Sequence, residues 1–340
     1  MSKITIKDIA KLTGLSASTV SRALADHPDI SEHTRNKVKE VAAQFEYQKN
    51  IYASFFRNNK SGLISLILPE INMFYFPNLI KSINKIITPL NYNLIISLTN
   101  NNSKTESELI EKCINWSVEG VLISLSKETK DLEFLRKLQK LNIPCVLIDK
   151  TKACKEFTTV TINNFDSSYD ATNYLLQKGH NKILGIFGSK DYSITTERIE
   201  GFNQALKNSG IDTDNENIIA VENSADVELI LPELLRKQLF SAIFTMSDEL
   251  LAKCIYVINK SGLRIPDDIS IITISDGVYP YLVNPNITHI KDSGSKLGKM
   301  AANTLLNMIN KKNEKEIEKI YVGTRLVELN SVNEIKMNSL

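Results

Sequence analysis

Short apolar runs alternate with amphipathic helical patterns from residue 62 onward, and this alternation restricts the possible folds more than any other feature of the sequence. The apolar runs span residues 63–69, 92–98, 119–125, 143–149, 182–188, 240–246 and 268–275. Helical patterns lie between them, for example at 104–117, 165–178, 194–209 and 248–261. Continuous apolar runs of this kind are typical of parallel strands that are buried on both faces. The sequence therefore predicts an α/β fold with parallel sheets covered by helices.

The number of expected strands indicates more than one sheet. About twelve strands are more than one twisted open sheet usually holds. Two doubly wound lobes account better for the pattern, and we expect the division between them near residue 162. Within the first lobe, the segment from Ser103 to Glu106 has capping-box spacing and predicts the start of a helix.

The first 45 residues have a different pattern, which predicts three short helices. A capping box at Thr5 and Asp8 starts the first helix, and Gly14 ends it at a tight turn. Ser16 and Ser31 are the predicted N-caps of the second and third helices. Residues 46–60 lack a strong apolar pattern and are interpreted as a linker with some helical character.

Charge is distributed unevenly along the chain, although the net charge is only +2. Residues 1–60 contain ten Lys or Arg residues against six Asp or Glu residues, so the rest of the chain is slightly acidic. A small basic domain on a near-neutral body favours a polyanion as the partner of that first domain.

The first two predicted helices have the spacing of a helix-turn-helix, in which the second helix enters the major groove of DNA. The outward face of that helix carries Ala17, Ser18, Ser21 and Arg22. Arg22 is suited to guanine, and Ala17 to a thymine methyl group. The hydroxyl groups expected to reach phosphates are those of Ser16, Thr19, Ser31 and Thr34. The competing interpretation is a solvent-exposed three-helix bundle without a DNA partner.

Several classes of function lack their sequence signals. The chain has no G-x-G-x-x-G, no phosphate-binding P-loop and no G-x-S-x-G motif, so no nucleotide enzyme or serine hydrolase is predicted. No histidine or cysteine has metal-ligand spacing, and we expect neither a metal nor a cofactor. The polar N-terminus and the absence of an apolar run of about 18 residues favour a cytoplasmic protein with reduced thiols.

The segments 4–24, 30–38 and 47–57, together with a series of segments in the body, resemble the LacI/GalR family of bacterial transcription regulators. The body segments are 66–83, 143–150, 179–188, 195–202, 244–253 and 263–276. The resemblance covers nearly the whole chain. It implies a sequence-specific repressor without enzyme activity, which binds pseudo-palindromic operator DNA as a homodimer. It also implies that a small effector, a sugar or a derivative, binds between two lobes of the periplasmic-binding-protein type I fold.

The same resemblance divides the chain into three parts. Residues 1–46 are the expected helix-turn-helix DNA-binding domain, 47–61 a hinge helix and linker, and 62–340 the effector-binding and dimerisation domain. Within that last domain we expect an N-lobe at about 62–162 and 291–319 and a C-lobe at about 163–290 and 320–330. No heptad leucine tail follows residue 330, which favours a dimer over a tetramer.

The resemblance implies an effector site at the carboxyl ends of the strands. Asp149 and Arg198 match effector ligands of the family, and Tyr75 and Phe76 match aromatic positions that stack on ligand rings. Further expected contacts are Ser124, Asp248, Ser275 and Asp276. Because Ser275 replaces a usual aspartate and Ala225 a frequent aromatic residue, a common hexose is a doubtful effector.

The resemblance also implies DNA contacts from the hinge, at Asn50, Ala53, Phe56 and Arg57. Phe56 is the expected wedge in the minor groove. The alternative is that Phe55 and Phe56 pack across the dimer without touching DNA. Two other functions remain open, namely a regulator controlled by a protein co-regulator and a solute-binding protein without DNA function.

Overall fold

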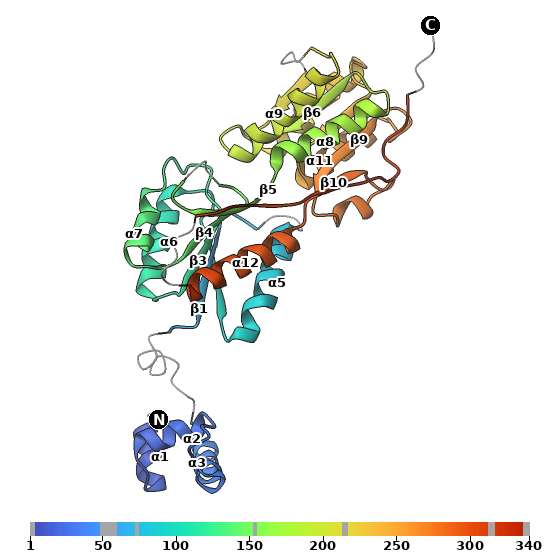
Figure 1. The fold of residues 1–340 in the computed structure, drawn as a ribbon. Coiled ribbons are helices and arrows are strands. Elements are labelled where there is room, and N and C mark those ends of the chain that lie inside the picture. Colours follow the sequence, from blue (N-terminus) through green and yellow to red (C-terminus); the bar gives the residue numbers. More distant parts are fainter. Residues whose placement is uncertain are drawn as a thin grey trace. The chain divides into compact units, whose positions relative to one another are not determined.

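The computed structural model describes residues 4–47, 60–71, 75–151, 155–212, 217–311 and 317–335. It consists of two compact units, a head at Met1–Ser61 and a body at Gly62–Leu340. Figure 1 shows the helices of the head and the two sheets of the body.

The head contains the three predicted helices. They are α1 (Ile6–Thr13), α2 (Ala17–Leu24) and α3 (Glu32–Gln44). The capping box of Thr5 and Asp8 is present, and Gly14 ends α1 in the left-handed conformation with a φ of 72°. Ser16 and Ser31 cap α2 and α3, as the sequence predicts. The small core of the head consists of Ile9, Ala10, Val20, Ala23, Val38 and Ala42.

The first sheet of the body is parallel throughout its described pairs, in the strand order β11-β5-β4-β3-β1-β2. Its strands are β1 (Leu63–Leu68), β2 (Asn93–Leu98), β3 (Gly120–Ile123), β4 (Cys145–Ile148), β5 (Thr158–Ile162) and β11 (Lys319–Val322). Its helices are α5 (Tyr75–Ile87), α6 (Ser103–Asn115), α7 (Arg136–Lys140) and α12 (Gly294–Asn310). Alternate strand residues pack on both faces, against α5 and α12 on one face and against α6 and α7 on the other.

The second sheet has the strand order β12-β10-β9-β8-β6-β7, and only β12 runs antiparallel to its neighbour in the described part. Its strands are β6 (Ile183–Phe187), β7 (Ile218–Ala220), β8 (Ala242–Thr245), β9 (Ser270–Ser275), β10 (His289–Lys291) and β12 (Arg325–Val327). Its helices are α8 (Asn164–Gln177), α9 (Ser193–Asn208), α10 (Val227–Arg236) and α11 (Asp248–Lys260). Short 3-10 turns occur at Thr88–Leu90, Glu133–Leu135, Ser224–Asp226 and Tyr279–Tyr281.

The predicted α/β class with two doubly wound lobes is confirmed, and every apolar run from the sequence contains a strand. We call the lobe built on the first sheet the N-lobe and the lobe built on the second sheet the C-lobe. The chain passes between the lobes after β5, after β10 and after β11. Among the described residues, no helix has both the length and the apolar composition that a membrane crossing requires.

The expected capping box at Ser103 is wrong. Asn102 is the N-cap of α6, and its side chain accepts a hydrogen bond from the Thr105 amide at 2.9 Å. The Glu106 carboxylate points inward and accepts a hydrogen bond from the Ser126 amide at 2.8 Å. Glu106 therefore bonds to the buried loop at Ser126, although the sequence pattern predicted that it would cap α6.

Close packing between helices fixes α5 and α9, which carry polar residues that lie between the lobes. A Cβ atom on Gly294 would lie 2.4 Å from the Tyr75 carbonyl oxygen, so α12 packs directly against the start of α5. A Cβ atom on Gly201 would lie 2.2 Å from the Phe165 carbonyl oxygen, so α9 packs directly against α8. These contacts hold Tyr75 and Arg198, respectively, at defined positions.

Candidate functional site

The second helix of the head presents its predicted DNA-reading residues on the surface. Ala17, Ser18 and Arg22 are exposed, while Thr19 and Ser21 are half-buried. Val20 and Ala23 on the opposite face of α2 are fully buried in the head core. Packing therefore fixes α2 from behind and leaves the Arg22 guanidinium accessible to a partner.

Hydroxyl groups cluster at the starts of α2 and α3. The Ser16 hydroxyl lies 2.8 Å from those of both Ser18 and Thr19, and the Ser31 hydroxyl lies 2.8 Å from that of Thr34. Hydroxyl groups and free amides at helix N-termini are suited to phosphate oxygens. The hinge predictions at Asn50, Ala53, Phe56 and Arg57 lie outside the described residues.

A second polar site lies in the body, at the carboxyl ends of strands from both sheets. Asp149 directly follows β4 of the N-lobe. In the C-lobe, Asp248 begins α11 after β8, Asp276 follows β9, and Asp292 follows β10. These four carboxyl groups are close enough for Asp149, Asp248 and Asp276 all to raise the pKa of Asp292. We call them the acidic cluster.

Arg198 is the cation of this cluster. It is only 6% exposed. Its Nε donates a hydrogen bond to Asn164 Oδ1 at 3.0 Å, and a terminal nitrogen donates one to the Met246 carbonyl oxygen at 2.5 Å. Its positive charge lowers the pKa of both Asp149 and Asp292. Arg198 is therefore buried within the site and does not lie on the surface of α9.

Asp276 joins the two lobes. Its carboxylate accepts a hydrogen bond from the Asn78 side chain of α5 and another from the Gly294 amide at the start of α12, the latter at 2.7 Å. Ser275 is buried beside it and accepts a hydrogen bond from the Gly277 amide at 2.9 Å. Burial raises the pKa of Asp276, and the bond from Asn78 partly offsets this effect.

Asp248 and Asp292 each keep one buried oxygen without a hydrogen-bond partner among the described residues. They are 8% and 6% exposed, respectively. Burial raises the pKa of Asp248 to about 6, although a hydrogen bond from Ser275 opposes the shift. Burial likewise raises the pKa of Asp292 to about 8, against the opposing charge of Arg198. A buried carboxylate oxygen without a donor is costly, so a ligand or water that donates a hydrogen bond to it is stabilised there.

The remaining predicted contacts lie on the N-lobe side. The Tyr75 hydroxyl is buried and lies near Asp149, whose pKa it lowers. The Phe76 ring packs in the core of the N-lobe and meets the Tyr75 ring edge-on, with 5.5 Å between the ring centroids. Ser124 is buried after β3, and its hydroxyl accepts a hydrogen bond from the Lys150 amide at 3.3 Å.

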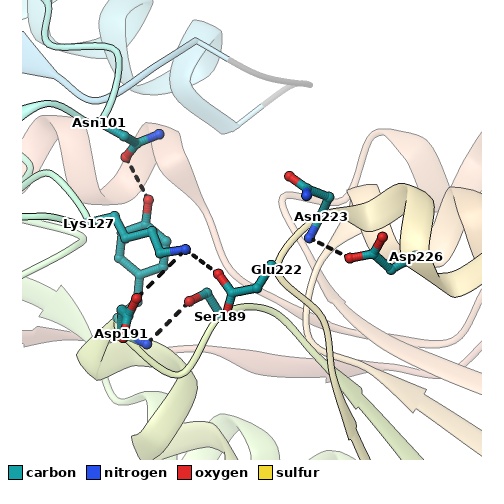
Figure 2. A network of polar contacts seen from close by, with 8 residues as sticks. Asn101, Lys127, Ser189, Asp191, Glu222, Asn223 and Asp226 are labelled. Carbon is teal, nitrogen blue, oxygen red and sulfur yellow. Dashed lines mark hydrogen bonds and ion pairs between the residues drawn. The ribbon is translucent and has the colours of Figure 1, made fainter.

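Ion pairs connect the two lobes at a second place. Figure 2 shows Lys127 of the N-lobe reaching toward Glu222 and Asp191 of the C-lobe. The Tyr192 hydroxyl donates to Asn101 Oδ1 at 2.6 Å, and the Lys150 ammonium lies 4.4 Å from the centre of the Tyr192 ring. A cavity of about 330 Å³ is lined by Leu125, Ser126, Lys150, Thr151, Lys190, Asp191, Tyr192, Ser193 and Thr196.

Sequence reasoning missed Asp292, Asn78 and Asn164. Asp292 follows a strand of only three residues, which carries too little apolar pattern to be noticed. The rule that ligands gather at the carboxyl ends of parallel strands would have identified it once β10 was known. In the part of the chain that the structure describes, no group of three or more His, Cys, Asp or Glu side chains is arranged to hold a metal ion.

Comparison with known proteins identifies the family. The family model described as bacterial regulatory proteins, lacI family, matches residues 5–50. The family model described as periplasmic binding proteins and sugar binding domain of LacI family matches residues 61–328. The probable HTH-type transcriptional repressor ExuR of Bacillus subtilis (strain 168) is 30% identical, over 97% of this chain and 98% of that protein.

Solved structures show the same fold. The lac repressor dimer bound to operator and the anti-inducer ONPF matches with a TM-score of 0.85 at 19% identity, over 98% of this chain and 100% of that one. A LacI family regulator from Enterococcus faecium with bound ribose matches with a TM-score of 0.71 at 24% identity, over 81% of this chain and 100% of that one. The chain thus belongs to the LacI family of bacterial regulatory proteins and is a DNA-binding transcriptional regulator.

Proposed function

We propose that the chain is a cytoplasmic repressor that binds a pseudo-palindromic operator as a homodimer and responds to a small polar effector held between its lobes. The observation that carries this proposal is the acidic cluster with Arg198, where strands of both sheets end and two buried carboxylate oxygens lack partners among the described residues. A ligand bound there contacts both lobes, and therefore favours one relative position of the lobes over others.

We propose a set of effector contacts at and beside the acidic cluster. They are Tyr75, Ser124, Asp149, Arg198, Asp248, Ser275 and Asp276, with Asp292 added. Phe76 supports the position of Tyr75 from the core. The bound ribose in the relative from Enterococcus faecium is consistent with a sugar or sugar derivative as the effector.

The head supports the operator-binding part of the proposal. Arg22 and Ser18 are exposed on α2 for contact with base edges, while Ser31 and Thr34 begin α3 with hydroxyl groups suited to phosphates. The hinge residues Asn50, Ala53, Phe56 and Arg57 complete the proposed DNA contacts.

The operator is identified by selection from randomised double-stranded DNA with the full-length protein. We expect the selected sites to be inverted repeats, because a two-fold symmetric dimer binds two equivalent half-sites. A single half-site, or no enriched sequence, would contradict the dimeric operator.

The effector is identified by a thermal-shift screen of sugars, sugar derivatives and nucleosides. A ligand that binds only the folded protein stabilises it by RT ln(1 + [L]/Kd). Each stabilising compound is then added to the complex of the protein with its selected operator. We expect at least one such compound to change operator affinity, whereas a response only to a protein co-regulator would contradict the small effector.

A further inference from the structure

The acidic cluster is unbalanced in charge. The cluster holds four carboxyl groups, and Arg198 lowers the pKa of two of them, Asp149 and Asp292. Lys291 adds a positive charge next to Asp276, and Lys150 lies between Asp149 and Glu70, with 3.6 Å from its ammonium to the Glu70 carboxylate. Glu70 balances Lys150, and Asp292, with a pKa of about 8, holds a proton near pH 7. The other three carboxyl groups of the cluster still outnumber the two cations Arg198 and Lys291, so a surplus of negative charge remains.

The unpaired atoms in the cluster are acceptors. Asp248 and Asp292 are each more than nine-tenths buried, and each has one carboxylate oxygen without a donor among the described residues. Arg198 does not donate to either of these two oxygens in the structure, and its described hydrogen bonds go to Asn164 and the Met246 carbonyl. A partner with positive charge favours the ionised form of Asp292, donates hydrogen bonds to the unpaired oxygens of Asp248 and Asp292, and removes the charge surplus.

The geometry does not suit a metal ion or an anion. The described His, Cys, Asp and Glu side chains form no metal-binding group. A carboxylate or phosphate on the ligand would face the same acidic residues, and the positive charge of Arg198 already acts on Asp149 and Asp292. Desolvated like charges at short distance repel strongly, so an anionic ligand is disfavoured.

We propose, on the basis of the function proposed above, that the effector is a sugar or similar polyhydroxylated compound bearing a protonated amine, which pairs with Asp248 and Asp292. An ammonium group supplies three donors, and it can therefore satisfy both unpaired oxygens at once. The hydroxyl groups of the same ligand have Asp149, Tyr75 and Ser275 within the site as partners. Burial is the largest cause of the raised pKa values of Asp248 and Asp292, and a cation bound beside them would oppose it, because a positive charge favours the ionised carboxylate.

The test compares ligands that differ only at one substituent. Titration calorimetry at pH 7 uses glucose, glucosamine and N-acetylglucosamine, and the corresponding galactose and mannose series. Glucuronic acid and galacturonic acid provide anionic members. We expect at least one amine to bind at least about tenfold more tightly than its parent sugar and its N-acetyl derivative, as one charge-assisted hydrogen bond implies.

Variants then test whether the preference for an amine depends on the acidic cluster. In Asp292→Asn, the tightest amine is expected to lose affinity about tenfold or more, while a neutral sugar loses much less. Asp212→Asn, an exposed substitution outside the cluster, is the matched control and is expected to keep the parent affinities. Near-UV circular dichroism confirms that each variant is folded.

The outcomes separate this inference from the proposed function. If only neutral or anionic members bind, or if Asp292→Asn keeps the amine preference, the amine assignment is overturned and a small effector still stands. If no member of any series binds, the amine-sugar assignment is overturned, and the broader thermal-shift screen decides the proposed function separately.

Discussion

Asn78 of the N-lobe donates a hydrogen bond to Asp276 of the C-lobe, and the second oxygen of Asp276 accepts one from the Gly294 amide. One carboxylate thus connects the end of β9 with the starts of both α5 and α12. Because Asp276 also raises the pKa of Asp292 and Asp248, this connection between lobes is part of the acidic cluster itself. A ligand that engages the cluster therefore acts directly on the contact between the lobes.

Removing the Asn78 side chain is expected to weaken that contact. Asn78→Ala leaves one oxygen of a buried carboxylate unpaired, which costs about 1–3 kcal/mol. Urea unfolding of the full-length chain measures the loss, with Asn115→Ala at the exposed end of α6 as the control. Equal stabilities of the two variants would show that the Asn78–Asp276 bond contributes nothing measurable.

Asp292 is expected to make stability depend on pH. Its pKa is about 8 in the folded chain against 3.8 for an ordinary aspartate. Between these values the folded chain holds a proton that the unfolded chain releases, so the free energy of unfolding falls as pH rises, by up to about 1.4 kcal/mol per pH unit. Asp248, with a pKa of about 6, adds a smaller contribution of the same sign.

Asp292→Asn removes that dependence, and the measurement is thermal unfolding at pH 5 and pH 8. We expect the melting temperature of the parent to fall more over this range than that of Asp292→Asn, and the variant to be the more stable of the two at pH 8. Asp212→Asn is expected to follow the parent. Parallel curves for the parent and Asp292→Asn would refute the buried, proton-binding state of Asp292.

Gly201 is expected to tolerate no side chain. A Cβ atom there would lie 2.2 Å from the Phe165 carbonyl oxygen, so Gly201→Ala forces α9 away from α8 and costs about 1–3 kcal/mol. A Cβ atom on Gly323 would meet nothing within 4 Å beyond its chain neighbours, so Gly323→Ala is the control. Because α9 carries Arg198, weaker effector binding is expected in Gly201→Ala but not in Gly323→Ala.

Arg22 is expected to give base specificity. Its exposed guanidinium on α2 is suited to two hydrogen bonds with one guanine, so Arg22→Ala is predicted to lose about 1–3 kcal/mol of operator affinity and to relax the preference at one base pair of each half-site. Thr34→Val is predicted to weaken binding evenly across sequences, because it loses only a phosphate contact. Selection from randomised DNA separates the two effects, and an unchanged preference in Arg22→Ala would contradict the assignment.

The lobes could be predicted from the sequence because their central strands are long and apolar. The runs at 63–69 and 268–275 contain β1 and β9 within one or two residues. The strands that escaped notice are short or rich in threonine and charged residues, as in β5 (TTVTI) and β10 (HIK). On one side each of them pairs with a strand farther along the chain, β11 for β5 and β12 for β10, which no local pattern reveals.

Some residues of the candidate site could likewise be predicted from the sequence, and others could not. Asp149 and Asp276 match positions of the family and stand at the ends of recognisable strands, so the sequence indicated their place at the carboxyl edges of the sheets. The burial of Arg198 depends on Asn164 at the start of α8 and on Met246 directly after β8. Likewise, only the packing of α5 places Tyr75 toward Asp149 and Phe76 into the core.

The central claim is that the acidic cluster controls operator binding. Fluorescence anisotropy of the selected operator tests it most directly, with the parent and with Asp149→Asn. Each protein is measured with and without the compound that stabilises the parent most in the thermal-shift screen. We predict equal operator affinity of both proteins without the compound, and an affinity change of about tenfold or more with it in the parent alone, corresponding to about 1.4 kcal/mol of coupling. The same change in Asp149→Asn, or no change in the parent, would contradict the account.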